Sequence, residues 1–176
     1  MSKITDKLLL SNVDIVHICD FFKIDLIACL RTEQLKTLVK RKPGAYIVNL
    51  QDSDQGNGSH WTAFYIYKNQ WCYFDSYGQP APPEVLVFCQ NITQKSINFD
   101  AIQALNRDIF CGFYAIAFCF TCLINKEHTM LDDILVDFCA PFDLNEQRNN
   151  AKILQTMFKQ MIKRKNTFQP KKIISL

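Results

Sequence analysis

The sequence is poor in glycine and proline and has no apolar run of the length that a membrane span needs. It contains 5 Gly and 6 Pro among 176 residues, and 48% of its residues are hydrophobic. This composition is typical of a globular protein and argues against a disordered chain. The early apolar stretch LLLSNVDIVHICDFF does not follow a basic start and is interrupted by Asn12, Asp14, His17 and Asp20. We therefore expect neither a signal peptide nor a membrane span.

The chain also lacks internal repeats, low-complexity linkers and any shift in composition that would mark a domain boundary. We predict a single domain over residues 1–176. A chain of this length can bury about two-thirds of the surface that it exposes when unfolded.

Cysteine, in contrast, is plentiful, with eight residues. In a secreted protein an even number could form a disulfide framework, but because no secretory signal is found we interpret these residues as reduced thiols. Cys119 and Cys122 form a CxxC pair inside an apolar helical stretch. Since no second pair accompanies them, core packing is favoured over a zinc or redox site.

Positive charge is concentrated at one end of the chain. The formal net charge is +3, yet the segment from Ala151 to Leu176 carries seven Lys or Arg residues and no acid, which leaves a mildly acidic body. Such a segment is either the solvated face of a helix with a frayed end or an electrostatic contact with nucleic acid. The sequence leaves both interpretations open.

Hydrophobic periodicity and turn residues predict helices, then strands, then helices, which indicates an α+β domain. Ser11 and Asp14 resemble a helix start at 11–22, and Thr32 is expected to cap a second helix that ends at Pro43 and Gly44. Strands are expected at 45–50, 60–67, 70–77 and 95–99, the middle two joined as a β-hairpin. Further helices are expected at 83–90, 111–124, 130–139 and 145–165, the last two each opened by a Thr or Asp cap.

The hairpin brings together two residues with catalytic potential. His60 stands at the head of one predicted strand and Asp75 near the foot of the next. Because the start of one antiparallel strand lies beside the end of its partner, both side chains should reach the same edge of the sheet. The Asp75 carboxylate could then hold the Nδ1 atom of His60, which fixes the tautomer and favours the imidazolium.

Cys111 is the candidate nucleophile. It begins the stretch CGFYAIAFCFTCLI, which is apolar on nearly every side and predicts a buried central helix. The unpaired N–H groups and the dipole at a helix N-terminus stabilise a thiolate, and Gly112 keeps the approach to it clear. A thiolate activated by an Asp-oriented His is sufficient for covalent catalysis.

Three stretches in this order, YIVNLQDSDQGNGSHWTAFYI, CYFDSYG and CGFYAIAFC, resemble the adenovirus maturation protease family. More broadly they resemble the SUMO-specific protease superfamily of cysteine peptidases. The shared pattern is an apolar strand ending in Val-Asn, then His-Trp-x-Ala-Phe, an aromatic strand ending in an acid, and Cys-Gly-aromatic at a helix start. It covers roughly residues 44–124, and the small size favours a viral maturation protease of the adenovirus, virophage or polinton type.

The resemblance implies a papain-like, adenain-like fold in which a central mixed β-sheet is flanked by helices and the nucleophile begins a buried helix. It implies catalytic roles for His60, Asp75 and Cys111 and places the main chain of Trp61 near the substrate. Family members favour small residues, often Gly, before the cut, so sites of the apolar-x-Gly-Gly or apolar-x-Gly-x kind are expected.

The oxyanion hole is expected to combine the backbone N–H of Cys111 with a side-chain amide. Gln103 resembles the glutamine that relatives use for this purpose. Asn106 lies closer to Cys111 in the sequence and is the alternative.

Three functions remain open at this stage. The first is an endopeptidase that cleaves viral capsid and core precursors, and the second is an isopeptidase that removes ubiquitin-like modifiers. The third is a non-catalytic nucleic-acid-binding protein in which the basic helix and tail at about 145–176 are the functional part. The chemistry requires no cofactor, although the resemblance implies activation by DNA or a viral peptide. Expected partners are capsid and core precursors and DNA, with no membrane, in the virion and the host cytoplasm or nucleus.

Overall fold

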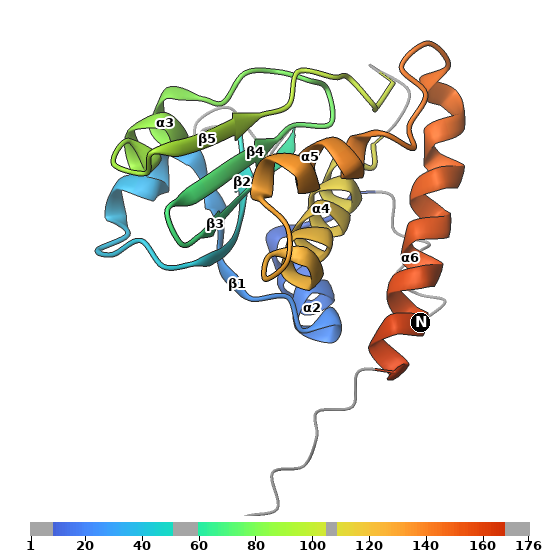
Figure 1. Cartoon of the computed structure of the whole chain (residues 1–176), viewed down its shortest axis with the longest axis horizontal. Helices are drawn as coiled ribbons and strands as arrows, with labels where there is room; N and C mark the ends of the chain where they lie inside the picture. The colour runs from blue at the N-terminus through green and yellow to red at the C-terminus, as the bar shows by residue number, and fades with distance from the viewer. Residues whose placement is uncertain (1–8, 51–59, 105–108, 168–176) are drawn as a thin grey trace, which may run out of the picture.

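A computed structural model describes residues 9–50, 60–104 and 109–167. These residues form an α+β fold in which a five-stranded mixed sheet is flanked by helices (Figure 1). The sheet has the order β1-β2-β3-β4-β5, with bounds Leu26–Arg31, Gly44–Asn49, Trp61–Tyr67, Gln70–Phe74 and Gln94–Ile97. The outer pairs β1–β2 and β4–β5 are parallel, and the inner pairs β2–β3 and β3–β4 are antiparallel.

The predicted hairpin is confirmed. Strands β3 and β4 pair in register from Ala63 with Phe74 to Tyr67 with Gln70. Lys68 turns the chain with a left-handed φ of 52°, as tight hairpin turns require. The first strand, β1, was not expected from the sequence.

The helices are α2 (Asn12–Phe22), α3 (Pro83–Cys89), α4 (Cys111–Asn125), α5 (Leu131–Cys139) and α6 (Asn150–Thr167), with short 3-10 helices η1 (Thr32–Thr37) and η2 (Gln147–Asn149). The Ser11 cap of α2, the Pro83 start of α3 and the buried helix α4 are confirmed.

Three predicted helix starts are wrong, because other side chains satisfy the exposed backbone groups. Arg31 stands before η1 and donates its backbone N–H to Gln34 Oε1 at 2.9 Å, so Thr32 is the first helical residue and not the cap. No Thr cap opens α5, where the N–H of Leu131 binds Gln70 Oε1 from β4 at 2.9 Å.

The third error concerns α6, which begins at Asn150 and not at 145. Asp143 Oδ1 accepts the backbone N–H groups of Asn145 and Glu146 at 2.8 and 2.9 Å. This local turn leads into η2, so the α-helix starts five residues later than the sequence suggested.

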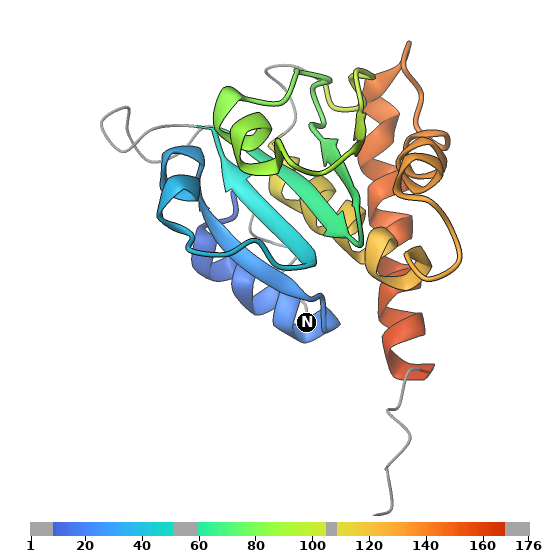
Figure 2. The same cartoon turned by 60° about the vertical axis from the view of Figure 1, so that its left-hand side comes forward.

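The sheet separates two apolar cores. Helices α2, α4, α5 and α6 cover one face, where they pack against Ala63, Tyr65, Cys72 and Phe74 of the sheet. Helix α3 and η1 cover the other face together with Tyr46, Phe64 and Tyr73 (Figure 2). Residues of both faces alternate along β3 and β4, as a sheet covered on two sides demands.

Helix α4 lies between the sheet and the outermost helix, α6 (Figure 2). Phe158 of α6 packs edge-on against Phe22 of α2 and Phe113 of α4, with ring centroids 5.9 and 5.6 Å apart. Within the described ranges, no helix combines the length and apolarity needed to cross a membrane.

Candidate active site

The structure brings His60 and Asp75 into direct contact. His60 Nε2 lies 2.8 Å from Asp75 Oδ1, and both residues are buried. The nitrogen that contacts the carboxylate is therefore Nε2. The sequence analysis had expected Nδ1. The difference lies in the orientation of the ring, which turns Nε2 toward Asp75. Nδ1 is therefore the nitrogen left for a reacting group, and it makes no hydrogen bond of its own.

Asp75 is held by a tight turn after β4. Its Oδ1 atom also accepts the backbone N–H of Tyr77 at 2.7 Å, while its backbone N–H donates to Asn98 Oδ1 at 2.8 Å. The turn closes through the N–H of Gly78, which donates to the carbonyl of Asp75 at 2.9 Å. Gly78 has a φ of 68°, and a Cβ there would lie 2.5 Å from the carbonyl oxygen of Phe99. Only glycine fits this position without strain.

Opposing effects set the charge on His60. Burial alone would lower its pKa, but the hydrogen bond to Asp75, the nearby Cys111 thiol and the negative charge of both raise it, and the net pKa is about 9. Tyr77 stacks on the imidazole with ring centroids 4.4 Å apart. The ring is thus oriented by a carboxylate at its edge and an aromatic ring on its face, and its raised pKa favours the imidazolium.

Cys111 is the first residue of α4, and its thiol is close enough to His60 to affect the pKa of the imidazole. The backbone N–H of Trp61 donates to its Sγ atom at 3.5 Å. The next residue, Gly112, allows a close approach, since a Cβ there would lie 3.2 Å from Leu10 Cδ1 and 3.4 Å from Trp61 Cδ1. The thiol therefore lies where the start of α4 meets the start of β3.

The environment of most other cysteines does not favour a thiolate. All eight cysteines are free. Burial raises the pKa to about 12 for four of them, Cys19, Cys29, Cys89 and Cys139. It also raises the pKa of Cys119 and Cys122. The CxxC pair lies inside α4 in the apolar core.

Gln103 is fully buried beside the turn that holds Asp75. Its Oε1 atom accepts the hydroxyl of Ser76 at 2.6 Å, and its Nε2 atom donates to the hydroxyl of Tyr77 at 3.2 Å. It is thus linked to His60 through the stacked ring of Tyr77. The alternative residue, Asn106, lies outside the described residues.

A groove of about 630 Å³ opens beside the thiol. Cys111, Gly112 and Trp61 line it, together with Leu10, Arg31 and Asn49 from the neighbouring elements. The Trp61 indole N–H donates to the carbonyl of Leu10 at 2.9 Å, which holds the segment before α2 at the edge of the groove.

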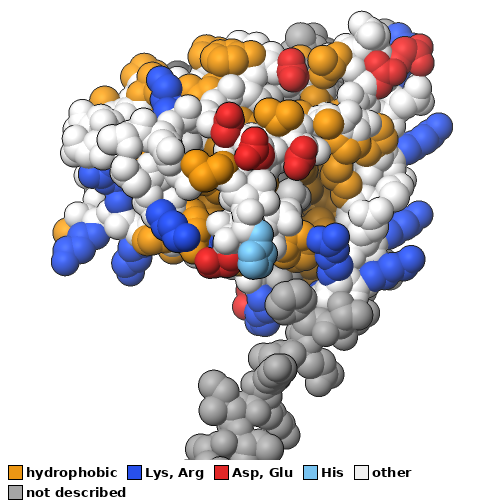
Figure 3. Space-filling model, viewed as in Figure 1, with side chains coloured by type: hydrophobic (Ala, Val, Ile, Leu, Met, Phe, Trp, Pro, Cys, Tyr) orange, Lys and Arg blue, Asp and Glu red, His pale blue; other side chains and the backbone are white. Residues whose placement is uncertain are grey.

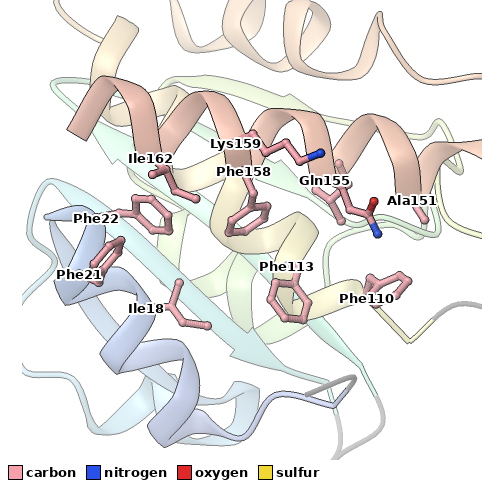
Figure 4. A pocket seen from close by; sticks show the side chains of 11 residues that line it. Ile18, Phe21, Phe22, Phe110, Phe113, Ala151, Gln155, Phe158, Lys159 and Ile162 are labelled. Carbon is pink, nitrogen blue, oxygen red and sulfur yellow. The ribbon is translucent and has the colours of Figure 1, made fainter. Parts of the chain in front are cut away.

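A second hollow of about 440 Å³ lies between α2, α4 and α6 (Figure 4). Its lining is mainly apolar and aromatic, with Gln155 and Lys159 as its polar members. Phe110 and Phe113 line this hollow, whereas Cys111 and Gly112 line the groove. The two spaces therefore lie on different sides of the start of α4.

Among the residues that the structure describes, no group of three or more His, Cys, Asp or Glu side chains could hold a metal ion. No protein-family model matches the chain, and no curated protein matches it significantly. Function must therefore be argued from the residues and their geometry.

The sequence reasoning missed Tyr77, Asn98 and Arg31. Tyr77 could have been noticed, because an aromatic residue two positions after Asp75 in FDSYG follows a residue with catalytic potential. No local pattern marks Asn98, which reaches Asp75 from beyond β5. The place of Arg31 beside the groove was missed because the strand that carries it, β1, was not expected.

Proposed function

We propose that this protein is a cysteine peptidase in which Cys111 is the nucleophile, His60 the acid and base, and Asp75 the residue that orients His60. The observation that carries the proposal is the 2.8 Å contact of His60 Nε2 with Asp75 beside the thiol that begins α4. A raised His60 pKa favours a thiolate–imidazolium pair, which is the reactive form of such a site.

In the proposed reaction the Cys111 thiolate attacks the carbonyl carbon of the scissile bond. The His60 imidazolium gives its Nδ1 proton to the leaving amine as the C–N bond breaks, which leaves a thioester on Cys111. His60, now neutral, takes a proton from water, and the resulting hydroxide attacks the thioester and releases the acid and the thiol. Asp75 keeps its contact with Nε2 throughout, so that Nδ1 faces the reacting atoms.

The tetrahedral intermediates carry negative charge on the carbonyl oxygen. The first N–H groups of a helix have no partner within the helix, so the backbone N–H of Cys111 supplies one donor. Gln103 is the proposed side-chain donor, because its buried amide is oriented by Ser76 and Tyr77 next to the catalytic pair.

We further propose a papain-like fold and the role of a viral maturation protease that cleaves capsid and core precursors in the virion or the infected cell. The ordered resemblance to the adenovirus proteases supports this role, together with a small α+β domain that has the thiol at the start of its central helix.

We include DNA as a partner, since Lys152, Lys159, Lys163 and Arg164 are exposed on α6 and basic side chains line its outer side (Figure 3). Binding through these residues should weaken steeply with salt. Salt-independent binding would contradict this contact.

The test is cleavage of viral capsid precursor proteins and of peptides with apolar-x-Gly-Gly sites by the purified protein. Cys111→Ala should lower kcat/KM at least about 10⁴-fold without unfolding the protein. Cys139→Ala is the matched control, because Cys139 is 8% exposed and Cys111 7%, and it should retain activity.

Two further outcomes are informative. An alkylating reagent should modify Cys111 faster than the other thiols, and equal modification of several cysteines would contradict the assignment. Cleavage of ubiquitin-like fusions in preference to capsid precursors would indicate the isopeptidase.

A further inference from the structure

The groove beside Cys111 has one charged side chain among its lining residues, that of Arg31. Arg31 ends β1, where its backbone N–H is held by Gln34 Oε1 at 2.9 Å. The other lining residues are apolar or neutral and polar, apart from the thiol itself. Arg31 is therefore the one charged residue among those that line the groove, and it lies on a strand whose position is fixed by pairing with β2.

The guanidinium of Arg31 is not fully satisfied within the protein. Its Nη1 atom is buried and has no hydrogen-bond partner. Across the described ranges, no carboxylate forms an ion pair with Arg31. A buried donor without a partner costs free energy on its own, and that cost is offset when a bound molecule supplies an acceptor.

We propose that Arg31 is a specificity-determining residue that binds an acidic side chain of the substrate. This inference rests on the proposed peptidase function. A guanidinium binds carboxylates through two parallel N–H···O bonds and retains its charge at any physiological pH. Because no acid lines the groove, a substrate carboxylate meets no repulsion there except from the thiolate.

The sheet register gives the position of the acidic residue relative to the cut. Arg31 pairs with Asn49, and Asn49 pairs with Trp61, whose backbone N–H donates to the thiol. Two strand spacings separate the Cα atoms of Arg31 and Trp61 by about 10 Å. An extended peptide covers that distance in about three residues, so the acidic residue should lie about two to four residues from the scissile bond.

Binding and cleavage should be measured separately, with peptides of the apolar-x-Gly-Gly kind that carry Asp or Asn, or Glu or Gln, at one position at a time. For binding, the Cys111→Ala variant prevents turnover. At one position within four residues of the cut, the acidic peptide should bind about 10- to 100-fold more tightly than its amide. Adding Arg31→Gln should reduce this preference to less than about threefold.

Two variants make the result specific. Lys36→Gln removes a positive charge from the same 3-10 helix that follows Arg31, but Lys36 lines a different hollow, so the preference should persist. Arg31→Glu should reverse the preference toward a Lys-containing peptide. This variant keeps the inference testable even if Arg31→Gln is poorly folded, as judged by circular dichroism.

The outcomes distinguish this inference from the proposed function. If acidic and amide peptides bind equally, or if the preference survives Arg31→Gln, the assignment of Arg31 is wrong whether or not the peptides are cleaved. If the acidic preference is found but the wild-type protein cleaves none of the bound peptides, Arg31 binds an acidic peptide and the peptidase proposal fails.

Discussion

The two ends of helix α4 each carry a charged cluster, but the clusters differ in how completely they are satisfied. At the C-terminal end, Lys126 donates to Asp25 Oδ2 at 2.6 Å and to the Tyr65 hydroxyl at 2.9 Å. That hydroxyl lies 2.8 and 2.6 Å from the two carboxylate oxygens of Asp25. This cluster is a closed network, and its cation lies at the helix end that the dipole makes negative.

The N-terminal end is incomplete. Beside the thiol of Cys111, the buried Nδ1 atom of His60 has no hydrogen-bond partner, and the same holds for Oδ2 of the adjoining Asp75. Buried polar groups are nearly always paired, and each exception calls for an explanation. The comparison suggests that the closed cluster holds α4 against the sheet, whereas the open cluster keeps acceptors and donors available for a reaction.

Conservative changes of the two aspartates should separate these roles most strongly. Asp75→Asn keeps the shape but removes the charge that orients His60 and stabilises its imidazolium, so kcat/KM should fall about 10²–10⁴-fold. Asp25→Asn should weaken the closed network and lower the melting temperature, with kcat/KM within about threefold of wild type. Similar losses of activity in both variants would contradict the division.

Removing the proposed oxyanion donor is the next test of the cluster at the N-terminal end of α4. Gln103→Ala should lower kcat about 10²–10³-fold, the usual cost of removing one such donor. Asn106→Ala should have a smaller effect, and a larger one would transfer the role to Asn106. Ser76→Ala is the control for position, because it removes the 2.6 Å bond to Gln103 Oε1 and leaves the amide N–H groups in place. If it costs as much as Gln103→Ala, Gln103 has a structural role only.

Proton loss from His60 should reduce the stability that the cluster at the N-terminal end of α4 contributes. The stability contributed by the closed cluster at the C-terminal end should not change. The folded-state pKa of about 9 lies above the ordinary value of 6.5. The contribution of His60 to stability is therefore complete below about pH 6.5 and is lost as the pH rises to about 9, by about 1.4 kcal/mol per pH unit. Burial and the neighbouring Asp25 raise the pKa of Tyr65, so that hydroxyl keeps its proton over the same range.

Urea unfolding between pH 6 and 9.5 measures this loss, and His60→Gln should abolish it. In parallel, kcat/KM should decline above about pH 9 as the imidazolium is lost. Asp75→Asn should move that decline to lower pH, because it removes the contact that raises the His60 pKa. An activity that is unchanged up to pH 10 would show that His60 does not act as the acid.

Local patterns in the sequence predicted much of the sheet and the helix that carries the thiol, because these depend on neighbouring residues. The hairpin through Lys68 and the apolar run after Cys111 are examples. Strand β1 was missed because its residues are half-buried throughout and show no alternation. Its position depends on parallel pairing with β2, a contact between distant residues that local periodicity does not encode.

The same limit applies to the site. The contact of His60 with Asp75 follows from the hairpin, whereas the choice of Nε2 depends on the rotation of the ring. That rotation is set by Tyr77 and by the turn at Gly78, which are tertiary features. Capping also failed where a distant side chain, such as Gln70 at Leu131, replaced the local Thr.

The smallest expected effect on turnover belongs to Lys126→Met, which tests whether the closed end of α4 is purely structural. Methionine keeps an unbranched side chain but removes the ammonium group, which lies 5.5 and 5.4 Å from the ring centroids of Tyr65 and Tyr67. Since the Lys126 and Asp25 side chains are 16% and 31% exposed, solvent moderates the loss, and we expect about 1–2 kcal/mol of destabilisation. Lys95→Met, at an exposed position on β5, should change stability by less than about 0.5 kcal/mol. If kcat/KM of Lys126→Met stays within about threefold of wild type while its stability falls, the clusters act independently. If kcat/KM falls about tenfold or more, the closed cluster at the C-terminal end of α4 controls the position of Cys111 at the N-terminal end.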